Sequence, residues 1–203
     1  HQNWLQDGML KISESTLTAE NIKELTDHIL LTVCQYIDAK IGALYLLKEN
    51  KLHLFSEFAM PERTEAPPVF SIGHGLVGHA LRQRKIVAVK HAESTLMTIQ
   101  TTFGCFSPAE IIAVPIFNGN ELIGAMEMGN MTPFQDIHFE FLKRAKQPIA
   151  LALASAISKD QIQMLLEETQ RQANILQLQQ QELQNSTLEL EQKTQELEAQ
   201  QEE

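Results

Sequence analysis

Apolar residues recur with a helical spacing at the start of the chain. Residues 1–17 carry a loose apolar stripe that predicts an N-terminal helix; its members are Trp4, Leu5, Met9, Ile12 and Leu17. Thr18 is a residue type that caps helices, and the apolar positions after it predict a second helix that ends near Ala39. The chain is therefore expected to begin with two amphipathic helices.

Two pairs of β-rich runs follow these helices. The first pair, Gly42–Lys48 and Lys51–Ala59, flanks Glu49–Asn50, and the second pair, Ile111–Phe117 and Leu122–Gly129, flanks a Gly-Asn-Glu turn. Strands joined by such short connections pair antiparallel. The pattern favours an α+β fold, in which one central antiparallel sheet has helices packed on one face.

The segment between the two hairpins is less regular. The sequence GHGLVGHALRQRK begins at Gly73 and predicts a tight turn into a short helix, and Ile86–Lys90 predicts a strand. Residues His91–Ala109 form a long connection rich in Thr and Ser. We therefore expect loops and short helices to cover the second face of the sheet.

The last part of the chain predicts one long helix, because every proline and glycine lies at or before Pro148. Leucines recur there every seven residues, and a second column in the same heptad register is mostly polar, which predicts a coiled coil. The expected contacts are Ile162, Leu166, Thr169, Ala173, Leu176, Leu183, Leu190 and Leu197. Pro148 removes a backbone donor from the closing helix. Either the helix kinks there and forms a hinge, which is the favoured interpretation, or a short helix ends near Ala145 and a new one starts with Pro148 in its first turn.

Charge and composition narrow the possible partners. The net charge is −10 with no basic run, which argues against nucleic-acid and anionic-membrane partners. Two cysteines are too few for a disulfide framework. No apolar run reaches the about 18 residues of a membrane span, so we expect no direct membrane contact. The chain begins with His1 and has no signal peptide, so we expect a piece of a longer protein.

The order of several sequence blocks resembles the GAF domain family. These blocks are GALYLL at Gly42–Leu47, GHGLVGHAL at Gly73–Leu81, the second hairpin with its IIAVPIF and ELIGAMEMG strands, and Phe134 with Leu142 in the closing helix. The Gln- and Glu-rich segment Leu165–Glu198 is similar to the connector that follows the HAMP-linked GAF domains of hybrid sensor histidine kinases. The resemblance covers nearly the whole chain.

This resemblance implies an organisation and a role. It implies an N-terminal linker helix over residues 1–17, a GAF-like domain over 18–155 and a coiled-coil signalling helix over 156–203. Such a module would be the cytoplasmic part of a bacterial inner-membrane sensor. It would form a homodimer through a parallel coiled coil, between upstream HAMP and transmembrane segments and a downstream kinase core. The alternative is a small-molecule-binding or thiol-redox protein of the same fold, whose helix serves only for oligomerisation.

The resemblance also implies a ligand pocket between the sheet and the connection His91–Pro108. The residues expected to line it are Phe70, Leu76, Thr102, Phe103, Cys105, Met126 and Met128. For the two methionines, packing in the core is the alternative. The sequence does not identify a ligand, and neither a cofactor nor a metal is expected.

Two further motifs are incomplete. Gly73–Gly78 matches the GxGxxG pattern of dinucleotide sites but lacks the flanks of a βαβ unit, so a turn into a helix is the favoured interpretation. Four histidines in this region lack the spacing and the carboxylate or cysteine partners of a metal site; they are His53, His74, His79 and His91.

Specialised GAF chemistry is also only partly matched. Cys105 lacks the neighbours that bilin-binding GAF domains have, and Cys34 lies far from it along the chain, which argues against thiol chemistry. Asn130, Phe134 and Asp136 match only part of the cyclic-nucleotide pattern. No catalytic set is present, so we expect no enzymatic activity of this piece itself.

Glu127 is an acidic residue inside the apolar run LIGAMEMG, and two interpretations stay open. Either it lies near a strand end where its face meets solvent, which is the favoured interpretation, or it is a buried carboxylate with a functional role.

Overall fold

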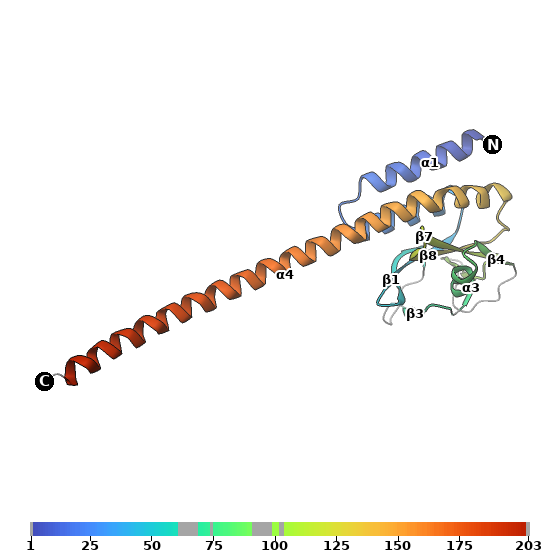
Figure 1. Ribbon diagram of the computed structural model, residues 1–203. Coiled ribbons are helices and arrows are strands. Elements are labelled where there is room, and N and C mark those ends of the chain that lie inside the picture. The colour runs from blue at the N-terminus through green and yellow to red at the C-terminus, as the bar shows by residue number, and fades with distance from the viewer. Residues whose placement is uncertain (1, 61–68, 74, 91–98, 102–103, 202–203) are drawn as a thin grey trace. The chain divides into compact units, whose positions relative to one another are not determined.

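The computed structural model describes residues 2–60, 69–73, 75–90, 99–101 and 104–201 (Figure 1). The chain divides into two units, His1–Ile157 and Ser158–Glu203. The first unit is the domain body, which contains the sheet. The second unit consists of the later part of helix α4 (Asp136–Gln201).

Helices open and close the domain body. Helix α1 spans Gln2–Leu17 and helix α2 spans Ile22–Tyr36, as the apolar stripes predict. The cap of α2 differs from the expected Thr18. Asn21 caps this helix instead, because its side-chain oxygen accepts a 2.9 Å hydrogen bond from the backbone N–H of Glu24.

Six strands form the main sheet, in the order β3-β2-β1-β8-β7-β4. Their bounds are β1 Ile41–Lys48, β2 Lys51–Phe58, β3 Val69–Ser71, β4 Val87–Lys90, β7 Glu110–Asn118 and β8 Glu121–Asn130. Every neighbouring pair is antiparallel. Both predicted hairpins are confirmed, as β1–β2 and β7–β8, and so is the α+β class with helices on one face of an antiparallel sheet.

The main core lies between the sheet and the helices α1, α2 and the first part of α4, which lie on one side of the sheet (Figure 1). Leu44 of β1, Val114 of β7 and Met126 of β8 form one row across the sheet, and all three are fully buried against these helices. Burial of each such side chain stabilises the fold by about 1.5–3 kcal/mol.

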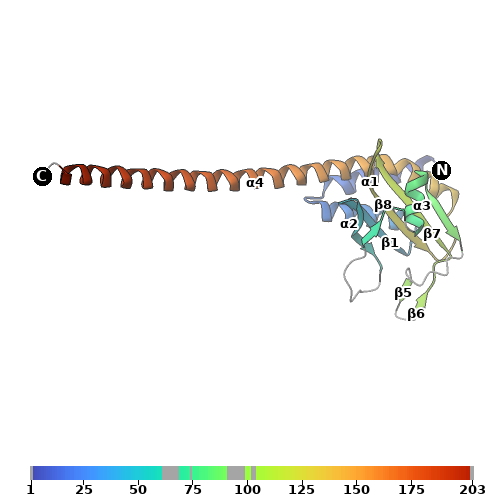
Figure 2. The same ribbon diagram turned by 60° about the horizontal axis from the view of Figure 1, so that its bottom comes forward.

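The opposite side of the sheet, named the α3 face, carries helix α3 (Gly75–Gln83) and a small separate hairpin, β5 (Ile99–Thr101) with β6 (Gly104–Phe106) (Figure 2). The sequence predicts only a connection where this hairpin forms, because three-residue strands are too short to show a periodic pattern. Leu81 of α3 packs against Tyr45 and Ala125, and Ile99 of β5 packs against Ile41 and Ile111. Both additions therefore cover apolar side chains of the sheet.

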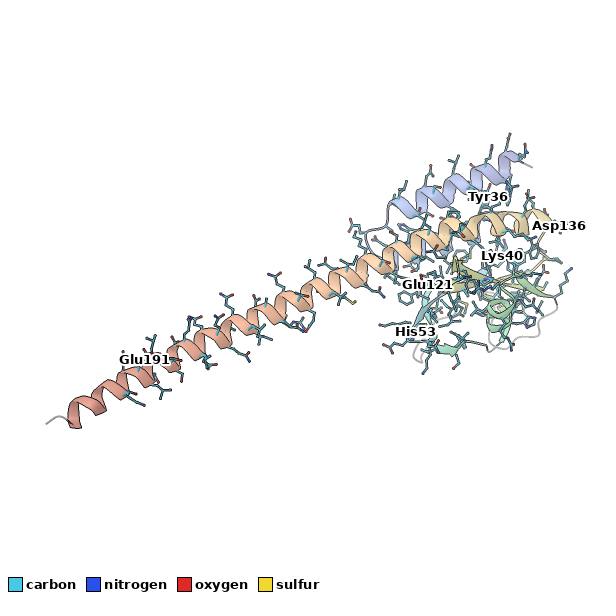
Figure 3. The ribbon with its side chains drawn as sticks, viewed as in Figure 1. Tyr36, Lys40, His53, Glu121, Asp136 and Glu191 are labelled. Carbon is cyan, nitrogen blue, oxygen red and sulfur yellow. The ribbon has the colours of Figure 1, made fainter. Side chains whose placement is uncertain are left out.

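An aromatic cluster attaches α1 to the other helices. The Trp4 ring stacks on Tyr36 with 4.4 Å between centroids, and Phe141 of α4 meets both rings. The Tyr36 hydroxyl donates to the backbone carbonyl of Trp4, and Tyr36 lies between α1 and the first part of α4 (Figure 3). Gly8 permits this packing, because any Cβ there would overlap the Tyr36 ring.

Substitution of Gly124 tests how closely β1 and β8 must approach at the centre of the sheet. A Cβ at this position would overlap the backbone carbonyl oxygen of Tyr45 on the neighbouring strand, which cannot move aside without opening the β1–β8 pairing. We expect Gly124→Ala to lower the free energy of unfolding by about 3 kcal/mol. Urea unfolding followed by the fluorescence of Trp4, the only tryptophan, measures this change.

Gly129→Ala on the same strand is the matched control. There a Cβ would lie 2.9 Å from a methyl group of Ile41 and 3.1 Å from the Pro108 ring, so the overlap involves side chains and not the backbone of the neighbouring strand. The loss should be smaller than that of Gly124→Ala, and equal losses would contradict a specific role for the close approach at Gly124.

Candidate functional site

Two of the residues expected to line a ligand pocket lie on the α3 face. Phe70 of β3 is 39% exposed, and its ring meets the Tyr45 ring edge-on with 5.6 Å between centroids. Leu76 of α3 packs against the cluster of Ile41, Ile99 and Ile111. Both side chains therefore lie on the side of the sheet where the pocket is expected.

Met126 and Met128 lie on the other face, which corrects the expected pocket. Both are fully buried in the main core beneath the helices. Strand alternation predicts that the two methionines share a face, but it does not say which face carries the helices. Met126 pairs with Leu44 of β1, whose side chain belongs to the helix-covered core, so the two methionines cannot line a site on the α3 face.

The remaining pocket candidates come from the β5–β6 region. Thr102 and Phe103 lie outside the described residues. The backbone of Cys105 belongs to β6 and pairs with Gln100, while its side chain also lies outside what the structure describes. Their part in a pocket stays a prediction.

Glu127 lies at the centre of the α3 face. It pairs with Ala43 of β1 on one side and with Ala113 of β7 on the other, and both alanines are fully buried. Strand alternation places it opposite its neighbours Met126 and Met128. The expected position near a strand end is therefore wrong, because Glu127 is paired on both sides in the middle of the sheet.

Burial raises the pKa of Glu127 from 4.5 to about 7, because a carboxylate loses hydration on leaving water. Among the described residues, Glu127 has neither a hydrogen bond nor an ion pair that would offset this cost. A carboxylate that is largely buried, unpaired in the described part of the chain and close to half-ionised at neutral pH is a candidate functional group.

A second buried carboxylate has a structural role that the sequence did not indicate. Glu110 is 1% exposed, and its Oε2 accepts a 2.6 Å hydrogen bond from the backbone N–H of Phe134. Asn130 accepts a 2.8 Å hydrogen bond from the N–H of Met131. Both side chains hold the connection between β8 and α4, so two members of the partial cyclic-nucleotide pattern, Asn130 and Phe134, are engaged in this turn.

The GHGLVG segment forms a turn into α3. Gly73 and Gly75 have positive φ angles of 112° and 66°, which favour glycine. A Cβ on Gly78 would overlap the backbone of Gly73, so the third glycine permits the close approach. The flanking strands belong to an antiparallel sheet, which supports the turn interpretation over a dinucleotide site.

Neither a metal cluster nor an activated thiol is visible in the described part of the chain. Its residues contain no group of three or more His, Cys, Asp and Glu side chains that could hold a metal ion. Cys34 is fully buried beside Gly42, and burial raises its pKa to about 12. A thiol with this pKa is protonated at neutral pH and is a poor nucleophile.

One described hollow has a volume of about 770 Å³ and lies elsewhere, between α2 and β2. It is lined by Lys23, Asp27, Leu31, Leu54, Phe55, Glu57 and Phe58. Lys23 and Asp27 form a 2.6 Å ion pair at its rim. None of the residues expected from the sequence to bind a ligand belongs to this lining.

The second unit exposes its apolar side chains. Leu176, Leu183 and Leu190 are 64%, 70% and 63% exposed, and Ile162 and Leu166 are also exposed. Thr169 and Ala173 are exposed in the same helix, while the side chain of Leu197 lies outside the described set. These heptad positions, the leucine column with its companion column, are the ones that the sequence predicts to meet a second helix, and they are named the seam positions of α4.

Pro148 lies inside α4 and within the domain body, where it is half-buried next to the buried Ile149. The helix continues through it, so no short helix ends before it. A hinge role for Pro148 stays a prediction.

Part of α4 is long and apolar enough to cross a membrane, judged by length and composition alone. A helix that contributes to a protein core satisfies the same criteria, and α4 buries Phe141, Leu142 and Leu153 in the core of the domain body. This property is weak evidence for a membrane span.

Comparison with known proteins identifies the family. The family model of the GAF domain matches residues 19–154, and the chain therefore belongs to the GAF domain family. No curated protein matches the chain. The GAF domain of an Acinetobacter phosphoenolpyruvate-protein phosphotransferase is 16% identical, with 77% of this chain and 97% of that chain covered and a TM-score of 0.64.

Two other solved structures show how widely this fold is used. The free methionine-R-sulfoxide reductase from Neisseria meningitidis, solved with its substrate, is 12% identical over 76% of this chain and 91% of its own, with a TM-score of 0.58. The GAF domain of a two-component sensor histidine kinase from Bacillus halodurans is 13% identical over 64% and 94%, with a TM-score of 0.51. The fold therefore occurs both in a kinase and in a redox enzyme.

The raised pKa of Glu127 predicts a pH-dependent stability. The folded state holds this proton more tightly than the unfolded state, so the contribution is present below pH 4.5 and is lost as the pH rises to about 7. We expect Glu127→Gln, which cannot ionise, to exceed the native chain in free energy of unfolding by about 3 kcal/mol at pH 8. Urea unfolding at several pH values measures the difference.

The two proteins should be equally stable at pH 4. Glu121→Gln on the same strand is the matched control, because Glu121 is exposed and its replacement should leave the stability unchanged at every pH. A difference between Glu127→Gln and the native chain that does not vary with pH would contradict the assignment.

Proposed function

We propose that this GAF domain is the sensory and dimerisation module of a sensor histidine kinase. Its helical second unit would pair with a second copy in a parallel coiled coil and pass a conformational signal to a downstream kinase core. The exposed seam positions of α4 carry this proposal. Membership of the GAF family and the occurrence of the fold in a two-component sensor histidine kinase support it.

A regular column of exposed leucines is not expected in a helix that stays alone in water, because exposed leucines do not stabilise it. From Ser158 to Gln201 the helix is about 65 Å long at 1.5 Å per residue, and its leucines have no core within the unit. Leu176, Leu183 and Leu190 are spaced by seven residues, which matches the 3.5-residue repeat of a coiled coil. Burial of such leucines between two helices would supply the free energy of association.

The polar companion column is compatible with burial in a seam. The hydroxyl groups of Thr187 and Thr194 donate to the backbone carbonyls of Leu183 and Leu190, at 2.9 and 2.8 Å. These hydroxyls therefore have partners within their own helix. Placing the threonines in a helix–helix interface costs less than burying unpaired hydroxyls would.

The positions beside the seam limit charge repulsion between identical helices. In the heptad register, the first four flanking positions on one side are glutamine, namely Gln163, Gln170, Gln177 and Gln184, and the next two are Glu191 and Glu198. Glu182 and Glu189 lie on the outer side of the same register. Neutral flanks favour the pairing of two copies of an acidic helix.

The wider context of the proposal follows from the kinase role. The upstream partners would be HAMP and transmembrane segments, and the module would lie in the cytoplasm of a bacterium as part of an inner-membrane sensor. Pro148, within the part of α4 that belongs to the domain body, would act as a flexible point ahead of the signalling helix. A thiol-redox enzyme is the less supported alternative, since Cys34 is buried with a raised pKa.

Substitutions in the seam test the dimer. We expect Leu183→Asn with Leu190→Asn to convert the dimer to a monomer, because each asparagine places an amide in the apolar column. Size-exclusion chromatography with light scattering measures the mass. Leu178→Asn with Leu188→Asn is the matched control, since these leucines are 67% and 57% exposed but lie off the seam, and it should remain dimeric. A native monomer, or loss of the dimer in both variants, would contradict the seam.

Cross-linking tests the parallel arrangement. In a parallel, in-register dimer, identical residues of the leucine column face each other, so Leu183→Cys should form a disulfide under mild oxidation. The variant is made with Cys105→Ser, which removes the other candidate thiol, and Leu178→Cys is the control that should not cross-link. A dimer in which Leu183→Cys stays reduced would indicate an antiparallel pairing.

A further inference from the structure

The α3 face contains an acidic position surrounded by small and apolar residues. Glu127 forms one row of the sheet with Ala43 and Ala113. On one side of this row lies the cluster of Ile41, Ile99 and Ile111, and on the other side lies the cluster that contains Tyr45 and Ala125. The two alanines present only methyl groups next to the carboxylate.

The first turn of α3 borders the same row. Leu76 packs against the isoleucine cluster, and the next residue, Val77, packs against the cluster of Tyr45 and Ala125. Consecutive residues of α3 therefore contact both sides of the row that holds Glu127. Helix, sheet and carboxylate together form a low-dielectric environment in which one charge–charge contact is stronger than in water.

The described residues around Glu127 provide no nearby cation. On the same face, the titratable groups are Glu57 of β2, which pairs with Ala43, Tyr45 of β1, and Arg84, whose guanidinium lies over the Phe117 ring and donates to Asn120. Strands β4 and β7 present apolar side chains in the rows around Glu127, and the His79 and Arg82 side chains of α3 are exposed. In the row of Glu127 the described charged group is therefore acidic, while Arg84 lies beside Phe117, which pairs with β8 five residues away at Leu122.

We propose that Glu127 is the anchor of a binding site for a small organic cation, a ligand with a primary ammonium group and a short apolar body. The ammonium would donate a charge-assisted hydrogen bond to the Glu127 carboxylate, and the apolar body would lie against the flanking clusters. The inference deepens the proposed sensory function, on which it rests for its role, by naming the class of ligand.

The same geometry disfavours two other ligand classes. An anion such as a nucleotide phosphate would meet a carboxylate rather than the cationic side chains or free N–H groups that phosphates require. A divalent metal ion needs several oxygen or nitrogen ligands, and the described residues offer no group of three. An ammonium ion requires only one such acceptor with apolar surroundings.

Binding of simple probes to the full chain tests the site. We expect n-butylammonium to bind in isothermal titration calorimetry at pH 8, and butyrate, of similar size but opposite charge, not to bind. Affinity for n-butylammonium should be about tenfold lower at pH 6, because a proton then competes for a carboxylate whose pKa is about 7. Glu127→Gln should abolish binding while the domain stays folded.

Glu121→Gln should bind n-butylammonium as the native chain does. Equal binding of n-butylammonium to Glu127→Gln, binding of butyrate with the same affinity, or no binding of n-butylammonium would overturn the inference. Light scattering on the same samples separates it from the proposed function. A dimer that does not bind the probe overturns this inference alone, and a monomer that binds it through Glu127 overturns only the dimeric role.

Discussion

The pairing of β1 with β8 at the centre of the sheet determines which side of the domain each strand residue occupies. This register places Leu44 beside Met126 and Ala43 beside Glu127. A shift by one residue would turn the large apolar side chains away from α2 and α4 and would place the carboxylate in the core. Gly124 keeps the register tight, because its missing side chain lets the carbonyl of Tyr45 approach. The β1–β8 register therefore determines both which side chains form the core and which lie on the α3 face.

Much of the fold could be predicted from the sequence because its signals are local. Apolar spacing predicts α1 and α2, and short turns between β-rich runs predict both hairpins. Strand alternation alone does not predict which face of β8 the helices cover, and so the expected position of Met126 in a pocket is wrong. The role of Glu110 was also out of reach, because its partner is a backbone N–H of Phe134, far along the chain.

The residues that build the GAF fold differ from the residue on which the proposed binding chemistry depends. Membership of the GAF family accounts for the sheet, the helices and the turn into α3, all of which serve packing. The binding chemistry proposed for this particular domain rests on one acidic side chain that lies between two alanines. The buried Cys34 also serves packing, since it fills the core beside Gly42.

The self-bonded threonines of α4 have a consequence for motion between two paired helices. In the last part of the register, one column repeats leucine at Leu183 and Leu190, and the other repeats threonine at Thr187 and Thr194. Sliding one helix past its partner by a full heptad, about 10 Å at 1.5 Å per residue, would bring like residues against like and would strand no hydroxyl. In a dimer of the proposed kind, the repeat of the columns would therefore set a step of one heptad for axial displacement, and each step would lose the leucine contacts of one heptad at the ends.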